Sequence, residues 1–425
     1  MGRKYFLIFI FLIFAGPARA EVNLVFDDFI PMRRETPSIT EFGYLVFPVL
    51  SVIPGVGTGF GAGSLVSNFL SSRAAFTGIV TLGDFSTAVL AVNGIGKPDD
   101  GVSIDIAAFS TKIPFQIYER GGEGNSNNYF TQLNAEAGGS ITLNANYWQK
   151  RLNFSSLVGV SRISTAQVND PDGTHFDNFD NSTTDSVFST SMLQLDLTDS
   201  YIDPRRGFRL EEFRNEDTVF DGLHARFATY DTNATAYIPV GEKSTWAFNY
   251  FRGWASMISD NTLSAAQLQK SMSLRCASTD SASRSKCQRA EDERVQTRAA
   301  ENKFGTATPL GAPMQMRAFP LGRFRGNQSL MYGSEFRLNF GNEKSNFDYG
   351  IVSGSLMALQ LAFFAEAGTA VDSPASVEAA NLRTSYGVGV RLGFSGSIVR
   401  ADIAMSNEGP QFTFFLGYPW GLSPF

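Results

Sequence analysis

The feature that most constrains this chain is a series of segments in which apolar and polar side chains alternate. In the stretch 384–394, aliphatic and aromatic residues such as Tyr386 and Val390 share one face, while a serine, glycines and Arg391 share the other. Alternation with a period of two is the pattern of a β-strand whose two faces meet different surroundings. Each segment runs for about ten residues, the length that a tilted strand needs to cross a membrane.

The polar faces of these segments carry charges and glycines. Glu335, Arg337, Glu366 and Asp402 all fall on such faces. In a transmembrane barrel the polar face lines a wet lumen and the apolar face meets lipid. A β-sandwich would turn the apolar face inward, and alternation alone does not separate the two folds. The length and number of the segments favour the barrel.

Turn signals such as Pro54-Gly55, Asp203-Pro204 and Gly409-Pro410 separate the segments. They predict an all-β fold, a closed antiparallel transmembrane β-barrel of about sixteen strands, because an even number lets the sheet close without a free edge. The predicted strands are 42–54, 57–69, 73–84, 86–96, 102–113, 128–143, 152–166, 187–199, 206–216, 224–239, 244–257, 329–340, 353–370, 383–395, 397–405 and 411–419.

The composition agrees with a strand-built membrane protein. The 425 residues include 38 Phe and 40 Gly, and only 18% are charged. The mean hydropathy of −0.08 is that of a soluble protein, but in a barrel the polar face offsets the lipid face in such an average. Composition by itself leaves a secreted β-sandwich or β-helix open.

The first twenty residues resemble a secretory signal peptide. Arg3 and Lys4 precede the apolar run 6–14, and Ala18-Arg19-Ala20 fits a cleavage site. The alternative is a retained anchor helix, for which the run is shorter than the ~20 residues required. We therefore predict a signal peptide at 1–20, a short segment at 21–41 and one barrel domain at 42–425.

A long polar loop is expected at 258–328 on the extracellular side. Its middle, 264–302, lacks Gly and Pro and predicts one or two short helices, with a disordered loop as the alternative. Cys276 and Cys287 predict one local disulfide in an exported chain. A metal pair is disfavoured because His175 and His224, the two histidines of the chain, are distant in sequence.

Composition and motifs also predict what the chain does not do. The net charge of −6 shows no block of one sign, which argues against a nucleic-acid partner. No phosphate loop or metal cluster is present in the sequence, so no cofactor is expected. His175, near Asp172 and Asp177, and the isolated His224 offer no nucleophile and base arrangement. We therefore expect no enzyme.

Four motifs occur in order along roughly the C-terminal half of the chain. The first is Asp196 and Asp199 followed by Pro204 and Gly207, and the second is 316–326, which contains Arg317, Ala318, Phe319, Gly322 and Arg323. The third is Glu366 with Gly368, and the fourth is Ser385 with Gly387 and Gly389. This ordered set resembles the bacterial surface antigen superfamily, the outer-membrane barrels that include the BamA and TamA assembly factors.

The resemblance implies that the long extracellular loop folds into the lumen and that its Arg317 meets acidic residues there, for which Glu335 and Glu366 are the matching candidates. A guanidinium can make two parallel hydrogen bonds to a carboxylate and so fix the loop. The alternative is a solvated loop charge. Ala318 replaces the family's glycine, Glu366 replaces its aspartate, and Arg325-Gly326 offers a second register.

The resemblance implies a short member of the superfamily that lacks POTRA domains, because only about twenty residues separate Glu21 from the first strand. We expect an integral outer-membrane protein that helps to insert or translocate proteins or lipids, with client polypeptides or a periplasmic protein as partners. Glycines 55, 57, 59, 61 and 63 predict a weak seam between the first and last strands, or else only a sharp bend of the barrel wall. The alternative function is a gated passive pore. Trp420 or Phe425 would end a C-terminal targeting signal.

Overall fold

The computed structural model describes residues 42–421, except for 70–72, 177–182, 202, 262, 277–280, 350–351, 373–376, 378–379 and 395–396. The predicted signal peptide at 1–20, the segment 21–41 and Phe425 lie outside the described residues.

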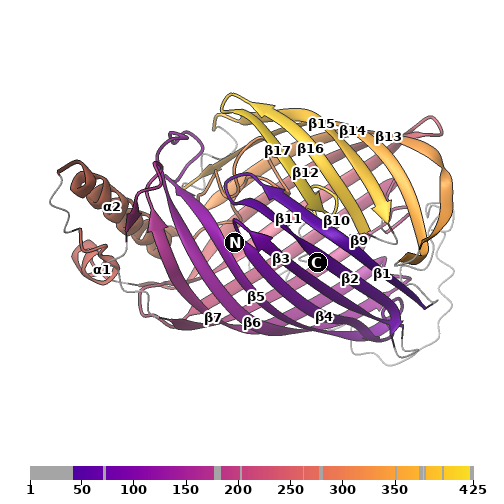
Figure 1. Cartoon of the computed structure of the whole chain (residues 1–425), viewed down its shortest axis with the longest axis horizontal. Helices are drawn as coiled ribbons and strands as arrows, with labels where there is room; N and C mark the ends of the chain where they lie inside the picture. The colour runs from indigo at the N-terminus through magenta and orange to yellow at the C-terminus, as the bar shows by residue number, and fades with distance from the viewer. Residues whose placement is uncertain are drawn as a thin grey trace, which may run out of the picture.

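The described chain is built almost entirely from strands in one sheet (Figure 1). The sheet has seventeen strands, of which the two-residue β8 (His175–Phe176) only extends the end of β7, so sixteen form the wall. These are β1 (Gly43–Ile53), β2 (Gly57–Phe69), β3 (Ala74–Gly83), β4 (Ser86–Gly96), β5 (Gly101–Tyr118), β6 (Tyr129–Tyr147), β7 (Leu152–Asn169), β9 (Thr184–Asp196), β10 (Gly207–Val219), β11 (Arg226–Val240), β12 (Ser244–Ser259), β13 (Gln328–Tyr349), β14 (Val352–Val371), β15 (Arg383–Phe394), β16 (Ser397–Ser406) and β17 (Gly409–Leu416).

Each wall strand pairs antiparallel with the next one along the chain, and β1 closes the ring. At one end of β1, Val52 lies opposite Phe414 of β17. Toward the other end, Tyr44 and Leu45 lie opposite Ser353 and Val352 of β14. The predicted closed antiparallel barrel of about sixteen strands is therefore confirmed.

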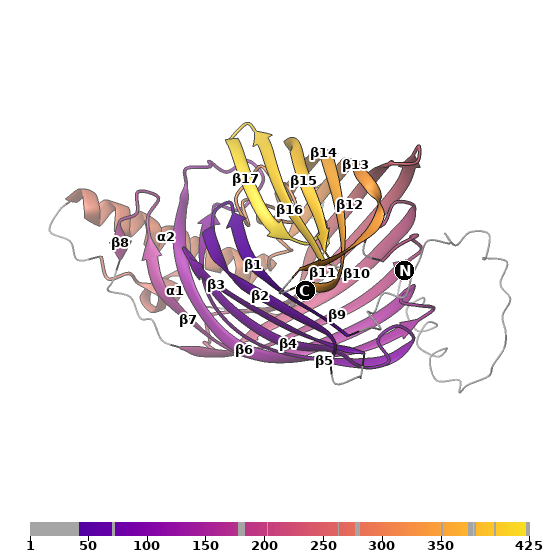
Figure 2. The ribbon, with the colours of Figure 1, turned by 45° about the vertical axis from the view of Figure 1, so that its right-hand side comes forward.

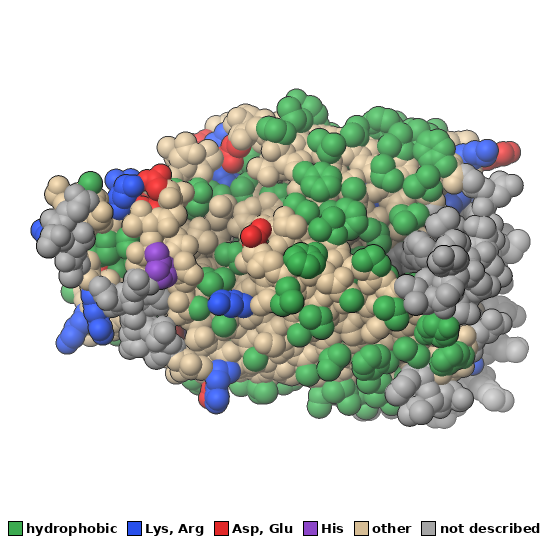
Figure 3. All heavy atoms as spheres, viewed as in Figure 1, with side chains coloured by type: hydrophobic (Ala, Val, Ile, Leu, Met, Phe, Trp, Pro, Cys, Tyr) green, Lys and Arg blue, Asp and Glu red, His purple; other side chains and the backbone are tan. Residues whose placement is uncertain are grey.

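The two faces of the wall differ as the alternation predicts. On β15, Val388 and Val390 are 43% and 46% exposed on the outside, whereas Ser385 and Arg391 are buried on the inside. Hydrophobic side chains gather along the outer wall in Figure 3, and most of the visible charged groups lie in the half that carries the helices. Such an apolar outer band is what a barrel presents to lipid hydrocarbon.

The predicted strand boundaries differ from the observed ones most at β13, which was predicted to end at 340 but runs to Tyr349. The last strand differs in the other direction, because it is shorter than predicted. The alternation predicted a strand to residue 419, but β17 ends at Leu416. Gly417 has φ +95°, a left-handed conformation that glycine adopts without strain. The chain turns inward there, and the Tyr418 hydroxyl donates to Asp203 Oδ1 at 2.7 Å instead of facing lipid.

The long loop between β12 and β13 contains two helices, as predicted, although the second is not short. They are α1 (Ala265–Met272), whose Ser264 forms a capping box with Gln267, and α2 (Ser281–Phe304). The predicted disulfide joins Cys276 to Cys287, with Cα atoms 5.7 Å apart. Neither described helix is apolar and long enough to cross a membrane.

The two helices lie at one end of the barrel, which is called the loop end below (Figures 1 and 2). Leu274, Cys287 and Ala290 form a buried cluster with Phe130 of β6 and Phe176 of β8. The disulfide therefore belongs to a small apolar core that attaches the helices to the rims of β6 and β7.

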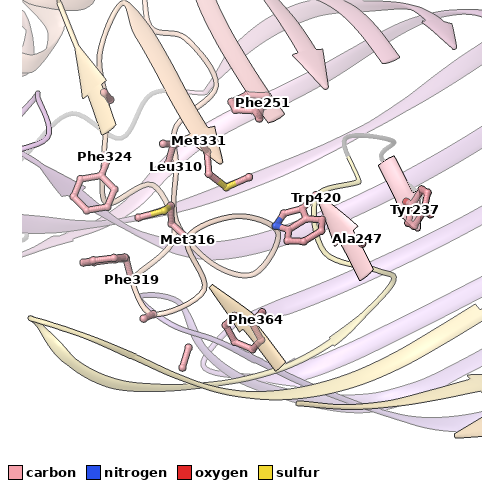
Figure 4. Packing of buried hydrophobic residues seen from close by; sticks show 13 residues of the cluster. Tyr237, Ala247, Phe251, Leu310, Met316, Phe319, Phe324, Met331, Phe364 and Trp420 are labelled. Atoms are coloured by element: carbon pink, nitrogen blue, oxygen red, sulfur yellow. The ribbon is translucent and has the colours of Figure 1, made fainter. Parts of the chain in front are cut away.

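After α2 the loop turns back into the lumen, where it forms the main apolar core. Loop residues pack against side chains from the inner faces of β11 to β14 and β16 (Figure 4). The members of this cluster are Tyr237, Ala247, Phe251, Leu310, Met316, Ala318, Phe319, Phe324, Met331, Phe364, Ala370, Ala404 and Trp420.

Candidate functional site: the arginine lock in the lumen

The segment 310–324 forms a closed hairpin-like turn inside the barrel. Leu310 and Phe324 exchange two backbone hydrogen bonds of 3.0 Å, and the Phe319 carbonyl accepts from the Ala312 amide at 2.9 Å. Gly311, with φ +149°, allows the two arms to approach, since a Cβ there would lie 2.0 Å from the Pro320 oxygen. This local bonding fixes the backbone that presents Arg317.

Arg317 is fully buried and faces the two glutamates that the sequence singled out. Its backbone N–H and Nε donate to the two carboxylate oxygens of Glu366 at 2.7 and 3.0 Å. Its Nη1 donates to Glu335 Oε2 at 2.8 Å. Glu366 is thus bound by both the main chain and the side chain of one residue, which fixes the position of the loop as well as its charge.

Three further arginines and one aspartate complete the network, which together with Arg317, Glu335 and Glu366 is called the lock below. Arg391 donates to Glu335 at 3.0 Å and to Asp402 at 2.5 Å, Arg400 donates to Asp402 at 2.6 Å, and Arg337 donates to Glu335 at 2.8 Å. The side chains of all these residues are at most 2% exposed. Buried charges at this density are tolerated only when paired and hydrogen-bonded, so removal of one member is costly.

Sequence reasoning missed Arg337, Arg391, Arg400 and Asp402 as members of this network. The signal was present, because all four fall on the polar face of alternating strands. What the sequence lacked was the register that places them level with Arg317. Ser385, also on that face, accepts a hydrogen bond from the Ala318 N–H at 3.0 Å, so alanine at the motif's glycine position keeps its backbone contact.

Aromatic rings enclose the Arg317 guanidinium. Its carbon lies 3.4 Å from the centre of the Phe364 ring and 5.7 Å from that of Trp420. Trp420 is buried, and its indole N–H donates to Glu366 Oε1 at 2.9 Å. Trp420, one of the two residues proposed to end the C-terminal signal, therefore lies inside the lumen, and its role in targeting stays a prediction.

Three motif glycines make room for the lock. A Cβ at Gly389 would lie 1.9 Å from Asp402 Oδ1 and 2.3 Å from Arg391 Nη1. A Cβ at Gly387 would lie 2.1 Å from the Ile403 oxygen, and one at Gly368 would lie 2.9 Å from the Leu330 oxygen and 3.1 Å from Met316 Sδ. Glycine is required at these positions by close approach, because all contacts below 3 Å would force neighbours to shift.

The motif residues Asp196, Asp199, Pro204 and Gly207 lie elsewhere, in the turn between β9 and β10. Asp196 accepts from Arg209 at 2.8 Å and from the Thr198 backbone at 2.9 Å. Asp199 accepts from the backbone amides of Arg205 and Arg206. Gly207 has φ +111°, and a Cβ there would lie 2.2 Å from the Leu197 oxygen. These residues shape the turn rather than contact Arg317.

Arg323 forms a second anchor, for which the sequence suggested no partner. It is fully buried, and its Nε and Nη2 donate to the Glu408 carboxylate at 3.0 and 2.8 Å. Its Nη2 also donates to the Gly124 carbonyl at 2.5 Å. Gly322, with φ +69°, provides the turn that separates this arginine from Phe319. Glu408 lies in the turn between β16 and β17, so this anchor reaches the last hairpin.

The C-terminal part of α2 is attached to the loop end by ion pairs. Glu301 accepts from Arg325 at 2.6 Å and lies 2.9 Å from Arg298. Burial raises the pKa of the Glu301 carboxyl, but Arg298 and Arg325 outweigh burial, and the pKa lies below its usual range. Burial lowers the pKa of Arg294, also on α2, to about 10.

Among the residues that the structure describes, no group of three His, Cys, Asp or Glu side chains could hold a metal ion. His224 Nδ1 lies 2.7 Å from Asp221, and His175 Nδ1 lies 3.0 Å from Asn169. The lock is therefore chemically an arginine–carboxylate network that positions a loop.

Comparison with known proteins finds similar solved structures only at low sequence identity. No protein-family model matches the sequence, and no match is found among curated proteins. The fold is similar to that of BamA from Haemophilus ducreyi lacking POTRA domains 1–3, with 12% identity, a TM-score of 0.49, and coverage of 89% of this chain and 70% of that one.

Two solved CdiB structures are similar to the same degree. CdiB from Acinetobacter baumannii has 10% identity and a TM-score of 0.49, with coverage of 89% of this chain and 59% of that one. CdiB from Escherichia coli has 9% identity, a TM-score of 0.48 and coverage of 89% and 62%. This chain spans about three fifths of each CdiB chain. The likeness is one of fold.

Proposed function

We propose that this chain is an integral outer-membrane barrel that assists the insertion or translocation of polypeptides at that membrane. The single observation that carries the proposal is the weak seam between its first and last strands. Within the described residues, β1 and β17 share one residue pair, Val52 with Phe414. By contrast, β1 pairs with β2 along its whole length, from Gly43 to Ile53.

A short ladder lowers the free energy needed to separate two strands, since each lost residue pair removes backbone hydrogen bonds. An open edge of β1 could then pair with an incoming strand, as exposed edges do. The lumen lock supports the same proposal, because it keeps the rest of the barrel rigid while one seam stays weak. The ordered motifs that resemble the surface antigen superfamily agree with this role.

The structure changes one part of the sequence-based argument. The glycines expected to loosen the seam lie in the β1–β2 turn and in β2, not in β1. A Cβ at Gly59 would lie 2.6 Å from the Phe85 ring, and one at Gly63 would lie 2.4 Å from the Phe47 ring. These glycines therefore accommodate aromatic rings, and the weakness comes from the short β1–β17 ladder instead.

The test is photo-crosslinking of client chains in cells. A photoreactive residue at Phe412, which is exposed on β17, should capture newly exported polypeptides. The matched control is Ile141, which is 59% exposed on the lipid-facing side of β6, away from the seam. Equal labelling at Phe412 and Ile141 would contradict a role of the seam.

The second candidate is a gated pore. It is favoured by a lumen cavity of about 340 Å³ that is lined by Phe109, Glu136, Asp217 and neighbouring residues. The loop core limits free passage, so a pore would need to be gated. Steady, large, ohmic openings in planar bilayers would favour the pore over the insertion role.

The proposed partners are outer-membrane lipid, client polypeptides and a periplasmic protein; nucleic acid is not among them. The apolar outer band, with residues such as Val158 and Ile106 exposed, supports the lipid contact. We also propose that the chain is not an enzyme, because its histidines bond to Asp221 and Asn169 rather than to a nucleophile. A cofactor is not part of the proposed mechanism.

A further inference from the structure

We infer that loop residues Pro320–Arg323, called the clasp below, hold the β1–β17 seam closed at the loop end. The clasp contacts the turns on both sides of the seam. Its effect on seam closure stands on geometry alone, while any control of client passage rests on the proposed function.

On the β1 side, the clasp bonds to the turn that follows the strand. The Leu321 N–H donates to the Pro54 carbonyl at 2.8 Å. Gly55, the next residue, packs directly against the clasp, because a Cβ there would lie 2.7 Å from Pro320 Cβ. A larger side chain at Gly55 would also be strained by its φ of +80°.

On the β17 side, the clasp binds the β16–β17 turn through Arg323. The guanidinium makes two hydrogen bonds to the Glu408 carboxylate, and it lies 4.8 Å from the centre of the Tyr118 ring. The Arg323 side chain is fully buried and that of Glu408 is 13% exposed. A bidentate, largely buried pair of this kind is strong and geometrically selective.

The seam itself offers little to replace these contacts. Its ladder contributes one residue pair, so Pro54 and Glu408 are joined more firmly through Leu321 and Arg323 than through the sheet. The segment that follows β17 is also bound to the loop, because the backbone N–H of Trp420 donates to the Met314 carbonyl at 2.9 Å. The loop therefore contacts the segments on both sides of the last strand.

The clasp and the lock are separable, because they use different partners. Arg317 bonds to strands β13 and β14, which lie within the well-paired wall. Arg323 bonds to the last turn. Loss of Arg323 should therefore free the seam at the loop end while the barrel remains folded around the lock.

The experiment measures seam closure by disulfide formation in the full-length protein in membranes. The reporter carries Val52→Cys and Phe414→Cys, which are opposite each other across the seam. The control reporter carries Phe60→Cys and Leu82→Cys, which are opposite each other on β2 and β3. Each is combined with Arg323→Ala, with Glu408→Gln, with both, or with Arg162→Ala, whose ion pair with Asp185 is exposed.

Arg323→Ala is expected to lower the initial rate of seam disulfide formation by about tenfold, because breaking a buried pair leaves one charge without its partner. Glu408→Gln should lower that rate in the same direction, and the double variant should be no worse than the more severe single variant. The control reporter should be unchanged in all backgrounds, and Arg162→Ala should behave as the parent.

Unchanged seam rates in both Arg323→Ala and Glu408→Gln would overturn the clasp. If Arg323→Ala fails to fold, as judged by heat-resistant gel migration, Glu408→Gln decides the question, because it alters only a turn. Client crosslinking at Phe412 is scored separately. If the variants lower the seam disulfide rate but Phe412 captures no client in any background, the result would contradict the proposed function and still support the clasp.

Discussion

Two stretches of the barrel wall share the same alternating pattern but have different interiors. On β13 to β16, the inward charges Glu335, Arg391 and Asp402 are fully buried under the loop. On β5 and β6, the inward charges Asp105 and Glu136 are only half-buried, and they border the open part of the lumen. Period-two alternation therefore sets which side chains point inward, and the loop decides whether they meet water.

The chemistry of each stretch follows from this difference. Asp105 accepts hydrogen bonds from neutral groups, the Asn144 amide at 2.8 Å and the Gly94 N–H at 2.6 Å, and water can supply the rest. Glu335 accepts from three arginines, Arg317, Arg337 and Arg391. A carboxylate shielded from water needs such partners, because an unpaired buried charge is costly.

Arg317→Ala is expected to have the largest effect, because it removes a cation from the buried stretch β13 to β16. It leaves Glu335 and Glu366 short of a cation in a dry site, and the expected loss is about 3–5 kcal/mol of stability. Heat-resistant migration on gels should fall sharply. Arg289→Ala, at an exposed position on α2, should migrate like the parent, and equal behaviour of the two variants would remove the lock.

The pair Glu366→Ala and Glu136→Ala tests the same residue type on the two stretches. Glu366→Ala removes one of the carboxylates that Arg317 binds and the acceptor of the Trp420 indole N–H, with an expected cost of about 3 kcal/mol. Glu136→Ala should change stability by no more than about 0.5 kcal/mol, as solvated sites do. Thermal unfolding in detergent measures both. Similar losses would show that the open stretch is as dry as the locked one.

Trp420→Phe tests whether the C-terminal segment, which returns into the lumen after β17, is part of the lock. It keeps most of the ring but removes the N–H that donates to Glu366, which should cost about 1.5–3 kcal/mol for a hydrogen bond to a charged group. Trp148→Phe, in the exposed β6–β7 turn, should have no measurable effect on the unfolding temperature. A neutral Trp420→Phe would argue that the C-terminal return is not part of the lock.

The smallest expected effect is the pH dependence of the α2 attachment. The pKa of Glu301 in the folded protein lies below its ordinary value near 4.5, so its ion pairs stabilise fully above that value. The stabilisation is lost as pH falls from about 4.5 through the lower folded pKa. Hydrogen exchange of α2 should rise in that window. In Glu301→Gln that pH-dependent rise should be absent.

Several features of the molecule could be predicted from sequence because they are local or periodic. The strand faces, the two helices with their disulfide, and the sixteen-strand closure all follow from alternation, turns and cysteine spacing. The inward turn at Gly417 and the burial of Trp420 could not be predicted, because alternation through Tyr418 reads as continued strand. The partner of Arg323 could not be predicted either, because Glu408 lies in a short turn that carries no motif.

The sequence by itself determined which side chains face inward, because neighbouring residues of a strand must point to opposite sides. Only the tertiary structure decided which inward charges meet one another. That depends on the register of four strands, β13 to β16, and on the path of the loop that carries Arg317, both of which are set by many contacts between residues distant in sequence. The contacts of the clasp were likewise decided only by the tertiary structure. Pro54, Arg323 and Glu408 share no local sequence pattern, and only closure of the barrel brings them together.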